Sequence, residues 1–283
     1  MRRIGGHVSM AGSLLNAVSK TVEIGANCMQ IFAGSPRLWF RKPFPDDQVK
    51  NFFEETKRLD ITPTFIHALY LVNLASTNKD ILDKSINSLI IDMQNGARIQ
   101  AAGVIVHIGS HLGLGFDAVK DQIVAVLQRV LAGTKDCDLI LENDAGQNGK
   151  IGSPEEISFL IKTIKDKRLK MCLDSAHLFE SGTDIRKQED VEKLSEKLIK
   201  LDLLDKLVCL HLNDSATSLD SHRDMHANIG EGEIGLTGLG NLINHDSFKD
   251  LPLILEVPGD NRAGCDEKNI TLVKGLVHSK YLG

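Results

Sequence analysis

Short apolar runs recur along the chain about every 25 to 45 residues, and longer amphipathic stretches separate them. The runs are rich in β-branched residues and nearly continuous, which is typical of parallel strands buried on both faces. Periodic apolar positions between them predict helices, for example at 79–100, 116–131, 154–165 and 187–203. The expected strands lie within residues 3–9, 28–33, 62–68, 103–110, 139–145, 170–176, 206–214 and 251–259.

The alternation of strand and helix patterns predicts repeated βαβ units. Eight units in 283 residues favour a (β/α)₈ TIM barrel, for which roughly 250 residues is typical. A doubly wound open sheet would usually carry a glycine-rich first turn, and "GGHVSMAG" matches G-x-G-x-x-G poorly. Ser153 and Pro154 form a typical helix start, because serine caps the first turn and proline suits its first position. We therefore expect an α/β fold with a single barrel domain over residues 1–283.

Composition narrows the class of protein. The chain is 42% hydrophobic and 25% charged, without any apolar stretch of 18 residues, so a membrane-spanning segment is not expected. Its first residues, "MRRIGGHVSMAG", lack the apolar region of a secretory signal. The five cysteines include no C-x-x-C pair, which favours a reduced, intracellular protein. The net charge of −5 supplies no general attraction to nucleic acid.

Polar side chains follow six consecutive apolar runs, where each strand is expected to end. In a TIM barrel these ends form the rim that carries the active site. The residues are of metal-binding type, and their spacing is about one βα unit. They are His67, His107, Glu142, Asp174, His211 and Glu256, and His177, Asp224 and His226 follow close behind.

Each of these residues also has a simpler interpretation. A single histidine at a strand end is more often a hydrogen-bonded loop residue, and a single carboxylate is usually a helix N-cap. Six such residues in succession are harder to explain separately. Four carboxylates at one barrel mouth would also have strongly raised pKa values unless cations neutralise them. The pattern therefore predicts a metal centre.

The nine candidates are nitrogen and oxygen ligands without cysteine, and they exceed what one ion requires. Catalytic zinc usually takes about three protein ligands and keeps a position for water. Nine ligands therefore indicate two or three ions, and the mixture of imidazole and carboxylate suits Zn²⁺ or Mn²⁺. Clusters of divalent ions are typical of phosphoester hydrolysis.

The sequence around these residues resembles a known family, endonuclease IV. Its members are zinc-dependent apurinic/apyrimidinic (AP) endonucleases, and the family is also called AP endonuclease family 2. The likeness extends over nearly the whole chain, from "IGGHVSMAG" to "GEGEIG". It is carried by three long segments: "HALYLVNLA" at 67–75, "CLDSAH" at 172–177 and "HLNDSATSLDSHRDMH" at 211–226. Family members are TIM barrels, which agrees with the fold expected from the pattern.

The resemblance implies three Zn²⁺ ions, with Mn²⁺ an alternative at one site. His67 and His107 would bind the first ion and share Glu142 as a bridge to the second. Asp174, His211 and Glu256 would complete the second site, and His177, Asp224 and His226 would hold the third. Glu142 would thus be the bridging carboxylate beside a zinc-bound hydroxide, and it is the expected catalytic residue.

The reaction implied by the resemblance belongs to base excision DNA repair. Family members hydrolyse the phosphodiester 5′ to an abasic site in double-stranded DNA and leave a 3′-hydroxyl. Arg37, Trp39, Tyr70 and Leu71 match family loops that enter the minor groove beside the lesion. Trp39 and Leu71 have a simpler interpretation as apolar caps of the barrel.

Several positions depart from the family pattern. Two cations near the expected phosphates are missing and two acids are added, so we expect weaker DNA affinity or slower incision than in a typical member. The departures are Ile108, Asp144, Ser175, Ala176, Ala216, Asp220 and Met225.

Two alternative functions remain open from the sequence. One is a metal-dependent sugar isomerase on a related barrel, which would need only one or two ions. The other is a catalytically weak protein that binds abasic sites. The resemblance favours a monomer. We expect a cytoplasmic protein, associated with the nucleoid if the source is prokaryotic.

Overall fold

The computed structural model describes residues 2–278 and contains a closed barrel of parallel strands. Strand β1 (Ile4–His7) pairs with β2 (Cys28–Phe32) on one side and with β10 (Leu253–Leu255) on the other, which closes the ring. The TIM barrel is therefore confirmed, and an open doubly wound sheet is excluded. The remaining barrel strands are β3 (Thr64–His67), β4 (Gly103–His107), β5 (Leu139–Glu142), β6 (Leu169–Asp174) and β7 (Leu207–His211).

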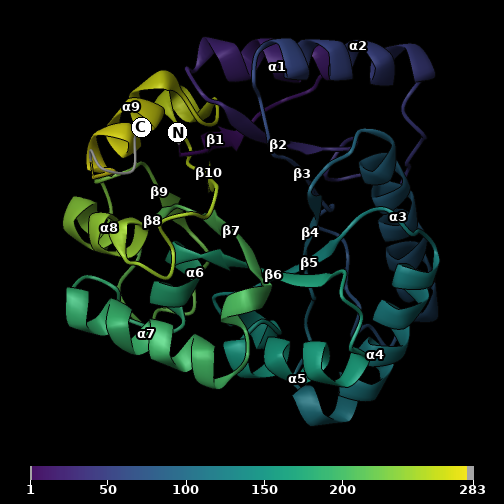
Figure 1. The fold of residues 1–283 in the computed structure, drawn as a ribbon. Coiled ribbons are helices and arrows are strands. Elements are labelled where there is room, and N and C mark those ends of the chain that lie inside the picture. Colours follow the sequence, from purple (N-terminus) through teal and green to yellow (C-terminus); the bar gives the residue numbers. More distant parts are fainter. Residues whose placement is uncertain (1, 279–283) are drawn as a thin grey trace.

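Helices surround the barrel, as Figure 1 shows. The helix that follows β3 is longer than any other in the described chain and spans 20 residues. The predicted helices lie at the expected places, and their ends differ from the expected bounds by at most three residues. The helices are α1 (Leu14–Glu23), α2 (Asp46–Arg58), α3 (Lys79–Arg98), α4 (Phe116–Ala132), α5 (Pro154–Ile164), α6 (Ser175–Glu180), α7 (Gln188–Lys200), α8 (Gly235–Asn244) and α9 (Glu267–Leu276).

The predicted start of α5 is confirmed in detail. The Ser153 hydroxyl accepts a hydrogen bond from the backbone N–H of Glu156, and the Glu156 carboxylate accepts one from the Ser153 N–H. This reciprocal capping box satisfies two N–H groups that have no partner within the helix. The start of α5 is thus encoded in four residues of local sequence.

Two apolar layers stabilise the barrel. A large cluster fills the space between the strands and the helices. A smaller one fills the barrel interior, as in other TIM barrels. Every barrel strand except β1 contributes one side chain to this inner apolar layer, and these are Cys28, Phe65, Ile105, Ile140, Cys172, Cys209 and Ile254.

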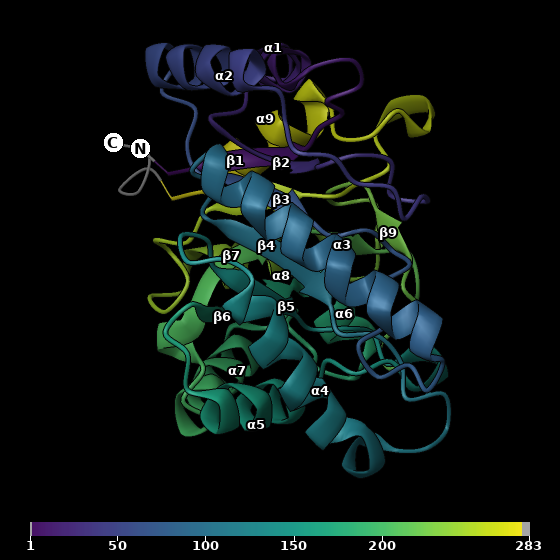
Figure 2. The same cartoon turned by 90° about the vertical axis from the view of Figure 1, so that its right-hand side faces the viewer.

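A short antiparallel pair lies outside the barrel sheet. Strand β8 (Asp214–Ser215) pairs with β9 (His226–Ala227), with Ser215 opposite His226. Figure 2 shows β9 and α6 towards the same end of the barrel. The pair closes the loop at 216–225 and places His226 beside β8, the strand that precedes this loop.

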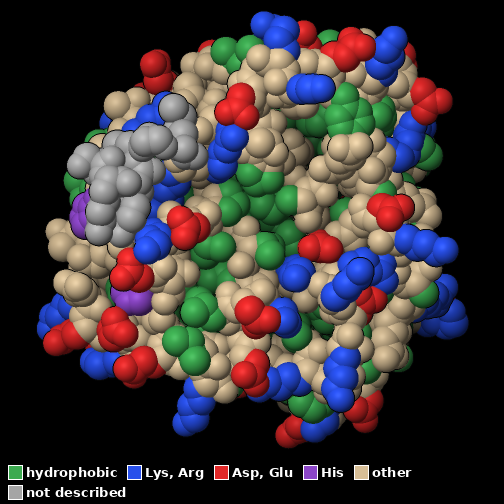
Figure 3. All heavy atoms as spheres, viewed as in Figure 1, with side chains coloured by type: hydrophobic (Ala, Val, Ile, Leu, Met, Phe, Trp, Pro, Cys, Tyr) green, Lys and Arg blue, Asp and Glu red, His purple; other side chains and the backbone are tan. Residues whose placement is uncertain are grey.

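The surface carries charges of both signs. On the face seen in Figure 3, Lys and Arg side chains alternate with Asp and Glu around a centre of hydrophobic side chains. No single sign dominates this face. Across residues 2–278, no helix is both long enough and apolar enough to cross a bilayer.

Candidate metal centre

The structure brings all nine predicted ligands to one end of the barrel. His67, His107, Glu142, Asp174 and His211 are the last residues of β3 to β7, and Glu256 follows β10 directly. Their ligand atoms fall into overlapping groups in which every pair of atoms lies within 4.8 Å. The groups are His67–His107–Glu142, Glu142–Asp174–His211–Glu256, Asp174–His177–His226 and His177–Glu180–Asp224.

Glu142 lies at the centre of the cluster and is fully buried. Its Oε2 is 3.2 Å from Nε2 of His67 and 3.5 Å from Nε2 of His107. Its Oε1 is 2.8 Å from Nδ1 of His211. The two oxygens of one carboxylate therefore face two different groups of ligands, which is the arrangement that a bridging carboxylate requires.

The second group is assembled from β6, β7 and the end of β10. Nδ1 of His211 lies 3.1 Å from Oε2 of Glu256 and 3.9 Å from Oδ2 of Asp174. Asp174 also caps α6, because its Oδ1 accepts a hydrogen bond from the His177 N–H at 3.0 Å. The N-cap interpretation of Asp174 is thus correct for one oxygen, while the other faces the cluster.

The third group forms where α6 meets β9. Nε2 of His177 lies 3.3 Å from Oδ1 of Asp224 and 3.4 Å from Nε2 of His226. Nε2 of His226 is 3.7 Å from Oδ2 of Asp174, so this group shares Asp174 with the second. Asp224 is the most exposed of the nine, with 32% of its side chain accessible.

The imidazoles are held by their outer nitrogens. A metal-binding histidine usually donates its second N–H to a nearby oxygen, which sets the tautomer and the ring orientation. Four of the five rings do so, and Nδ1 of the fifth, His107, lies 3.1 Å from the Asp144 carboxylate. The outer nitrogens donate from His67 to Ala68 O (2.7 Å), from His177 to Asn143 O (3.0 Å), from His226 to Glu256 O (3.1 Å) and from His211 to Gln30 Oε1 (2.8 Å).

This donor set fits divalent cations. The inner nitrogens face buried carboxylates, and buried acids are costly unless cations or hydrogen bonds compensate them. Burial alone would raise the pKa of Glu142, but the imidazoles of His107 and His211 hold that pKa well below its usual range. Burial would lower the pKa of His177, yet Asp174 and Asp224 raise it well above the usual value. The imidazoles thus compensate the buried carboxylates, and divalent cations bound between them would do the same.

Several residues of the site were not identified from the sequence. Gln30, in β2, donates from Nε2 to Oε1 of Glu256 at 2.5 Å and accepts from His211. Nδ1 of His7 lies 3.3 Å from the same Glu256 oxygen. Asn213 donates to Oδ2 of Asp174 at 2.6 Å. Gln30 is two residues after the buried Cys28 and therefore lies on the same face of β2. This alternation was the one sequence signal that could have placed Gln30 in the barrel interior.

A cavity of about 350 Å³ opens over the cluster. Its lining includes His67, His107 and Tyr70. The Tyr70 side chain is 63% exposed, although its ring contacts Phe32 and His67 edge-on or at a tilt. Leu71, the next residue, is 38% exposed. Of these two predicted DNA-contact residues, Tyr70 lines the cavity beside the candidate metal centre, and Leu71 is its neighbour in the chain.

The loop that follows β2 carries the other two. Arg37 is exposed, whereas Trp39 is half-buried and packs against the outer apolar cluster. The capping interpretation of Trp39 therefore describes part of its surface. The neighbouring Leu38 and Phe40 are 60% and 69% exposed, and they were not singled out in the sequence.

A buried ion pair stabilises this loop. Nε of Arg41 lies 3.0 Å from Oδ1 of Asp92 in α3, and neither side chain is accessible. Nη1 of Arg41 donates to the carbonyls of Ser35, Leu38 and Phe40. A single guanidinium thus fixes the backbone on both sides of Arg37 and Trp39.

The departures from the family pattern fall into two environments. Asp144 is buried, and its Oδ2 contacts Lys150 at 3.2 Å as well as His107. Its charge is thus compensated inside the site. Three others lie exposed on the loop between β8 and β9, namely Ala216, Asp220 and Met225. Ile108, Ser175 and Ala176 are buried.

Glu180, at the end of α6, anchors the loop that carries Asp224 and His226. Its Oε1 accepts hydrogen bonds from the Ser215 hydroxyl at 2.7 Å and from the Met225 N–H at 3.2 Å. Burial raises the pKa of this carboxyl to about 7, although both hydrogen bonds act in the opposite direction. Glu180 was not identified from the sequence, because nothing in "AHLFESG" indicates which distant backbone it meets.

Comparison with known proteins places the chain among its relatives. Residues 18–275 match a family model described as a xylose isomerase-like TIM barrel. A probable endonuclease 4 of Halothermothrix orenii is 38% identical over 96% of this chain and 99% of its own length. The crystal structure of endonuclease IV from Thermus thermophilus superposes with a TM-score of 0.86, at 31% identity over 97% of this chain and 98% of that one.

Sugar epimerases share the fold at lower similarity. The crystal structure of a D-tagatose 3-epimerase-like protein has a TM-score of 0.71 at 20% identity, over 99% of this chain and 97% of that one. This similarity concerns the barrel and carries no argument about the reaction. The similarities in sequence and structure extend over almost the whole chain, so they include the barrel end at which the nine predicted ligands lie. The chain therefore belongs to the xylose isomerase-like TIM barrels and, within them, to the endonuclease IV family.

Proposed function

We propose that this protein is a zinc-dependent AP endonuclease of base excision repair, which hydrolyses the phosphodiester 5′ to an abasic site and leaves a 3′-hydroxyl. The observation that carries the proposal is the division of the Glu142 oxygens, one towards His67 and His107 and the other towards His211. The names of the relatives, endonuclease 4 and endonuclease IV, support it. We further propose that the protein acts as a cytoplasmic monomer on double-stranded DNA.

The residues would hold three ions in adjacent sites. His67 and His107 would bind the first, and Glu142 would bridge it to a second held by Asp174, His211 and Glu256. His177, Asp224 and His226 would bind the third. When bound, zinc lowers the pKa of a bound water to near neutral pH and stabilises the negative charge on the leaving oxygen. Mn²⁺ can do the same at one site.

The protein's own contribution is orientation. Each imidazole presents its inner nitrogen because its outer nitrogen is held by a carbonyl, by Gln30 or by Asp144. A site whose ligands are fixed before the substrate binds needs no reorganisation during the reaction. Since Glu142 is fully buried and in contact with three imidazoles, its carboxylate can hold the two halves of the centre at a constant separation.

The four predicted DNA-contact residues would position the lesion over the cavity. Tyr70 lines the cavity over the cluster, and both Tyr70 and Leu71 are exposed. Arg37 and Trp39 lie on the loop that Arg41 fixes. A guanidinium and apolar side chains suit entry into the minor groove, where they can separate neighbouring base pairs. An abasic nucleotide leaves the helix at low energetic cost, which supplies selectivity.

The first test is incision of a duplex that contains one tetrahydrofuran abasic analogue. Zinc-loaded protein is expected to cut only the strand with the analogue, on its 5′ side, and the new end should be extendable by a DNA polymerase. Chelated protein should not cut, and added zinc should restore cleavage. Cleavage that survives chelation, or cleavage 3′ to the analogue, would contradict the proposal.

Binding of the analogue and conversion of a sugar substrate separate the alternatives. Zinc-loaded protein that binds the analogue without cutting would indicate an abasic-site-binding protein. Conversion of a ketose such as D-tagatose, with no cleavage of DNA, would indicate a sugar epimerase or isomerase. The exposed loop departures predict a smaller salt dependence of DNA binding than in relatives with cations there. Replacing Ala216 with Lys and Met225 with Arg should strengthen binding and steepen its salt dependence.

A further inference from the structure

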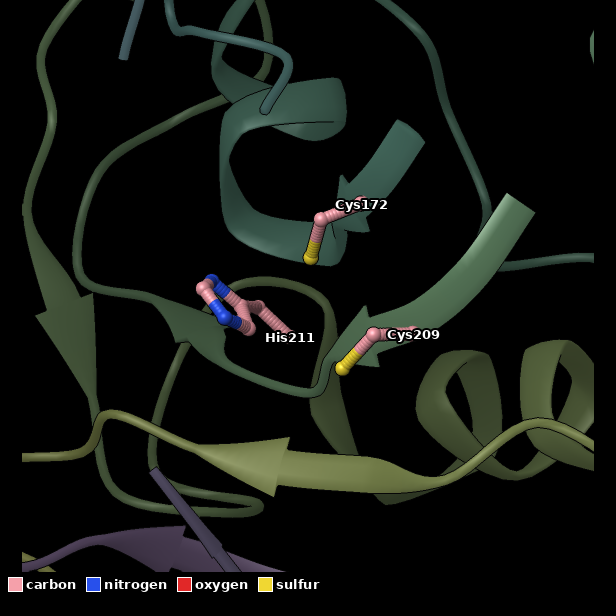
Figure 4. Close-up of side chains that lie close together, drawn as sticks. All are labelled: Cys172, Cys209 and His211. Carbon is pink, nitrogen blue, oxygen red and sulfur yellow. The ribbon is translucent and has the colours of Figure 1, made fainter. Parts of the chain in front are cut away.

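Two cysteines and one predicted metal ligand lie together where the inner apolar layer meets the candidate metal centre. Cys172 in β6 pairs directly with Cys209 in β7 in the sheet register. His211 follows Cys209 by two residues along β7, so the two side chains are on the same face of the strand. Figure 4 shows the three side chains around a common space. All three residues are fully buried.

The distances within this group suit metal binding. Sγ of Cys172, Sγ of Cys209 and a ring nitrogen of His211 all lie within 4.8 Å of one another. Metal–sulfur bonds of about 2.3 Å place two sulfurs about 3.8 Å apart around a tetrahedral ion, and about 4.6 Å apart around a linear one. Small rotations of the side chains would therefore be enough to close the group around an ion.

The types of donor atom in this group indicate which class of metal ion it would bind. Two sulfurs and one imidazole favour soft, thiophilic cations, whereas the imidazoles and carboxylates of the cluster above suit borderline ions such as Zn²⁺ or Mn²⁺. Neither cysteine is in a disulfide. Cys28 belongs to the same apolar layer, but it lies in β2, and its thiol faces the Leu253 carbonyl at 3.7 Å. Cys28 is therefore a matched control that shares the layer and the burial of the other two.

His211 couples this group to the centre above it. Its Nδ1 lies 2.8 Å from Glu142, and its Nε2 donates to Gln30 at 2.8 Å. Because the N–H at Nε2 is held by Gln30, an ion that keeps this contact must take Nδ1, the nitrogen that faces Glu142. Binding of a soft ion at Nδ1 and binding of a cation beside Glu142 therefore compete, and such coupling is reciprocal.

We propose that Cys172, Cys209 and His211 form a binding site for a thiophilic cation such as Cd²⁺ or Cu⁺, and that its occupation displaces metal from the centre around Glu142. Binding releases the two thiol protons to solvent and involves no change of oxidation state. The ion would enter through the barrel mouth, beside Glu142 and His211. The binding site is independent of the proposed nuclease function, and only the expected loss of incision depends on that function.

The experiment uses the full chain loaded with zinc and titrated with Cd²⁺. Wild-type protein is expected to develop ultraviolet thiolate-to-cadmium charge-transfer absorption that saturates at about one equivalent, with release of zinc to a chromogenic chelator. Cadmium bound only by oxygen and nitrogen gives no such band. Cys172→Ala and Cys209→Ala should each remove most of the band, and Cys28→Ala should keep it.

Incision of the abasic analogue is followed in the same samples. One equivalent of Cd²⁺ should lower the wild-type rate about 10-fold or more, and the Cys209→Ala rate less than about 2-fold. Absence of the band in wild-type protein would overturn the proposal, even if the alanine variants did not fold. So would a band that persists in both variants or disappears in Cys28→Ala. If zinc-loaded protein cuts no DNA, the band and the zinc release still decide the binding site.

Discussion

Two layers inside the barrel differ in chemistry although they come from the same strands. Along every barrel strand except β1, a side chain of the inner apolar layer lies two residues before a side chain of the candidate metal site. The pairs are Phe65 and His67, Ile105 and His107, Ile140 and Glu142, Cys172 and Asp174, Cys209 and His211, and Ile254 and Glu256, and Cys28 with Gln30 continues the series in β2.

Alternation along a strand explains the offset. Side chains at positions i and i+2 lie on the same face, so both layers point into the barrel. The lower layer is apolar and needs only tight packing. The upper layer is equally buried in places, for Glu142, Asp174 and His211 have no accessible surface. It requires hydrogen bonds and opposite charges because buried ionisable groups are costly without them.

We therefore expect stability and chemistry to be separated by about 7 Å along these strands, the rise of two residues. Changes in the lower layer should therefore alter the free energy of unfolding. Changes in the upper layer should alter metal binding and reaction. Substitutions at Glu142, Phe65 and Gln30 test this division, and a fourth, at Glu180, tests the cost of burying the carboxyl that anchors the neighbouring loop.

The largest effect is expected for Glu142→Gln. The substitution keeps the shape but removes the charge that faces both groups of ligands, so incision should fall about 10³-fold, while binding to the abasic analogue is partly retained. Incision rates and zinc content are measured together. Glu155→Gln, on the surface of α5, is the matched control and should have the wild-type rate. An unchanged rate in Glu142→Gln would remove the bridging role.

The next effect concerns the lower layer. Phe65 is 1% exposed, and Phe65→Ala should lower the free energy of unfolding by about 3–5 kcal/mol, because it leaves a cavity in the barrel interior. Denaturant unfolding of chelated protein measures it. Phe40→Ala, at a side chain that is 69% exposed, should stay within about 0.5 kcal/mol of wild type. A Phe65→Ala protein with lower zinc stoichiometry but full stability would reverse the assignment of the two layers.

A smaller effect is expected for Gln30→Leu. This side chain joins His211 to Glu256, and its loss should weaken zinc binding about 10- to 100-fold through misorientation of both ligands. Competition with a zinc-binding dye measures the affinity. Gln128→Leu, at an exposed position of α4, is the control. Wild-type affinity in Gln30→Leu would mean that packing alone orients His211.

The smallest effect is expected for Glu180→Gln in chelated protein. The folded-state pKa of about 7 lies above the ordinary value of 4.5, so the folded state loses stability relative to the unfolded chain as the pH rises from about 4.5 to about 7. Glutamine removes this penalty but can still accept the Ser215 and Met225 hydrogen bonds. The variant should be about 1–2 kcal/mol more stable than wild type at pH 8 and equally stable at pH 4.

Thermal unfolding at the two pH values measures the difference. Equal stability of variant and wild type at pH 8 would mean that solvent reaches the Glu180 carboxylate. Lower stability at both values would mean that its hydrogen bonds outweigh the cost of burial.

Much of the fold was predictable because its signals are local. Apolar runs, helix periodicity and the Ser153–Glu156 capping box depend on residues that are neighbours in the sequence. The closure of the ring was inferred from the number of units, and the pairing of β1 with β10 confirms it. The choice of six of the nine predicted ligands also followed from position, because His67, His107, Glu142, Asp174 and His211 end β3 to β7 and Glu256 follows β10 directly.

The sequence by itself determined the alternation of strands and helices, the residue types at each strand end and the resemblance to endonuclease IV. Only the tertiary structure decided which oxygen of Glu142 faces which imidazole, and that Gln30 orients His211 from 181 residues away. It also decided that Cys172 and Cys209 are neighbours across two strands. The physical reason is range: strand periodicity is set within a few residues, whereas the orientation of a ring depends on partners that meet only when the barrel closes.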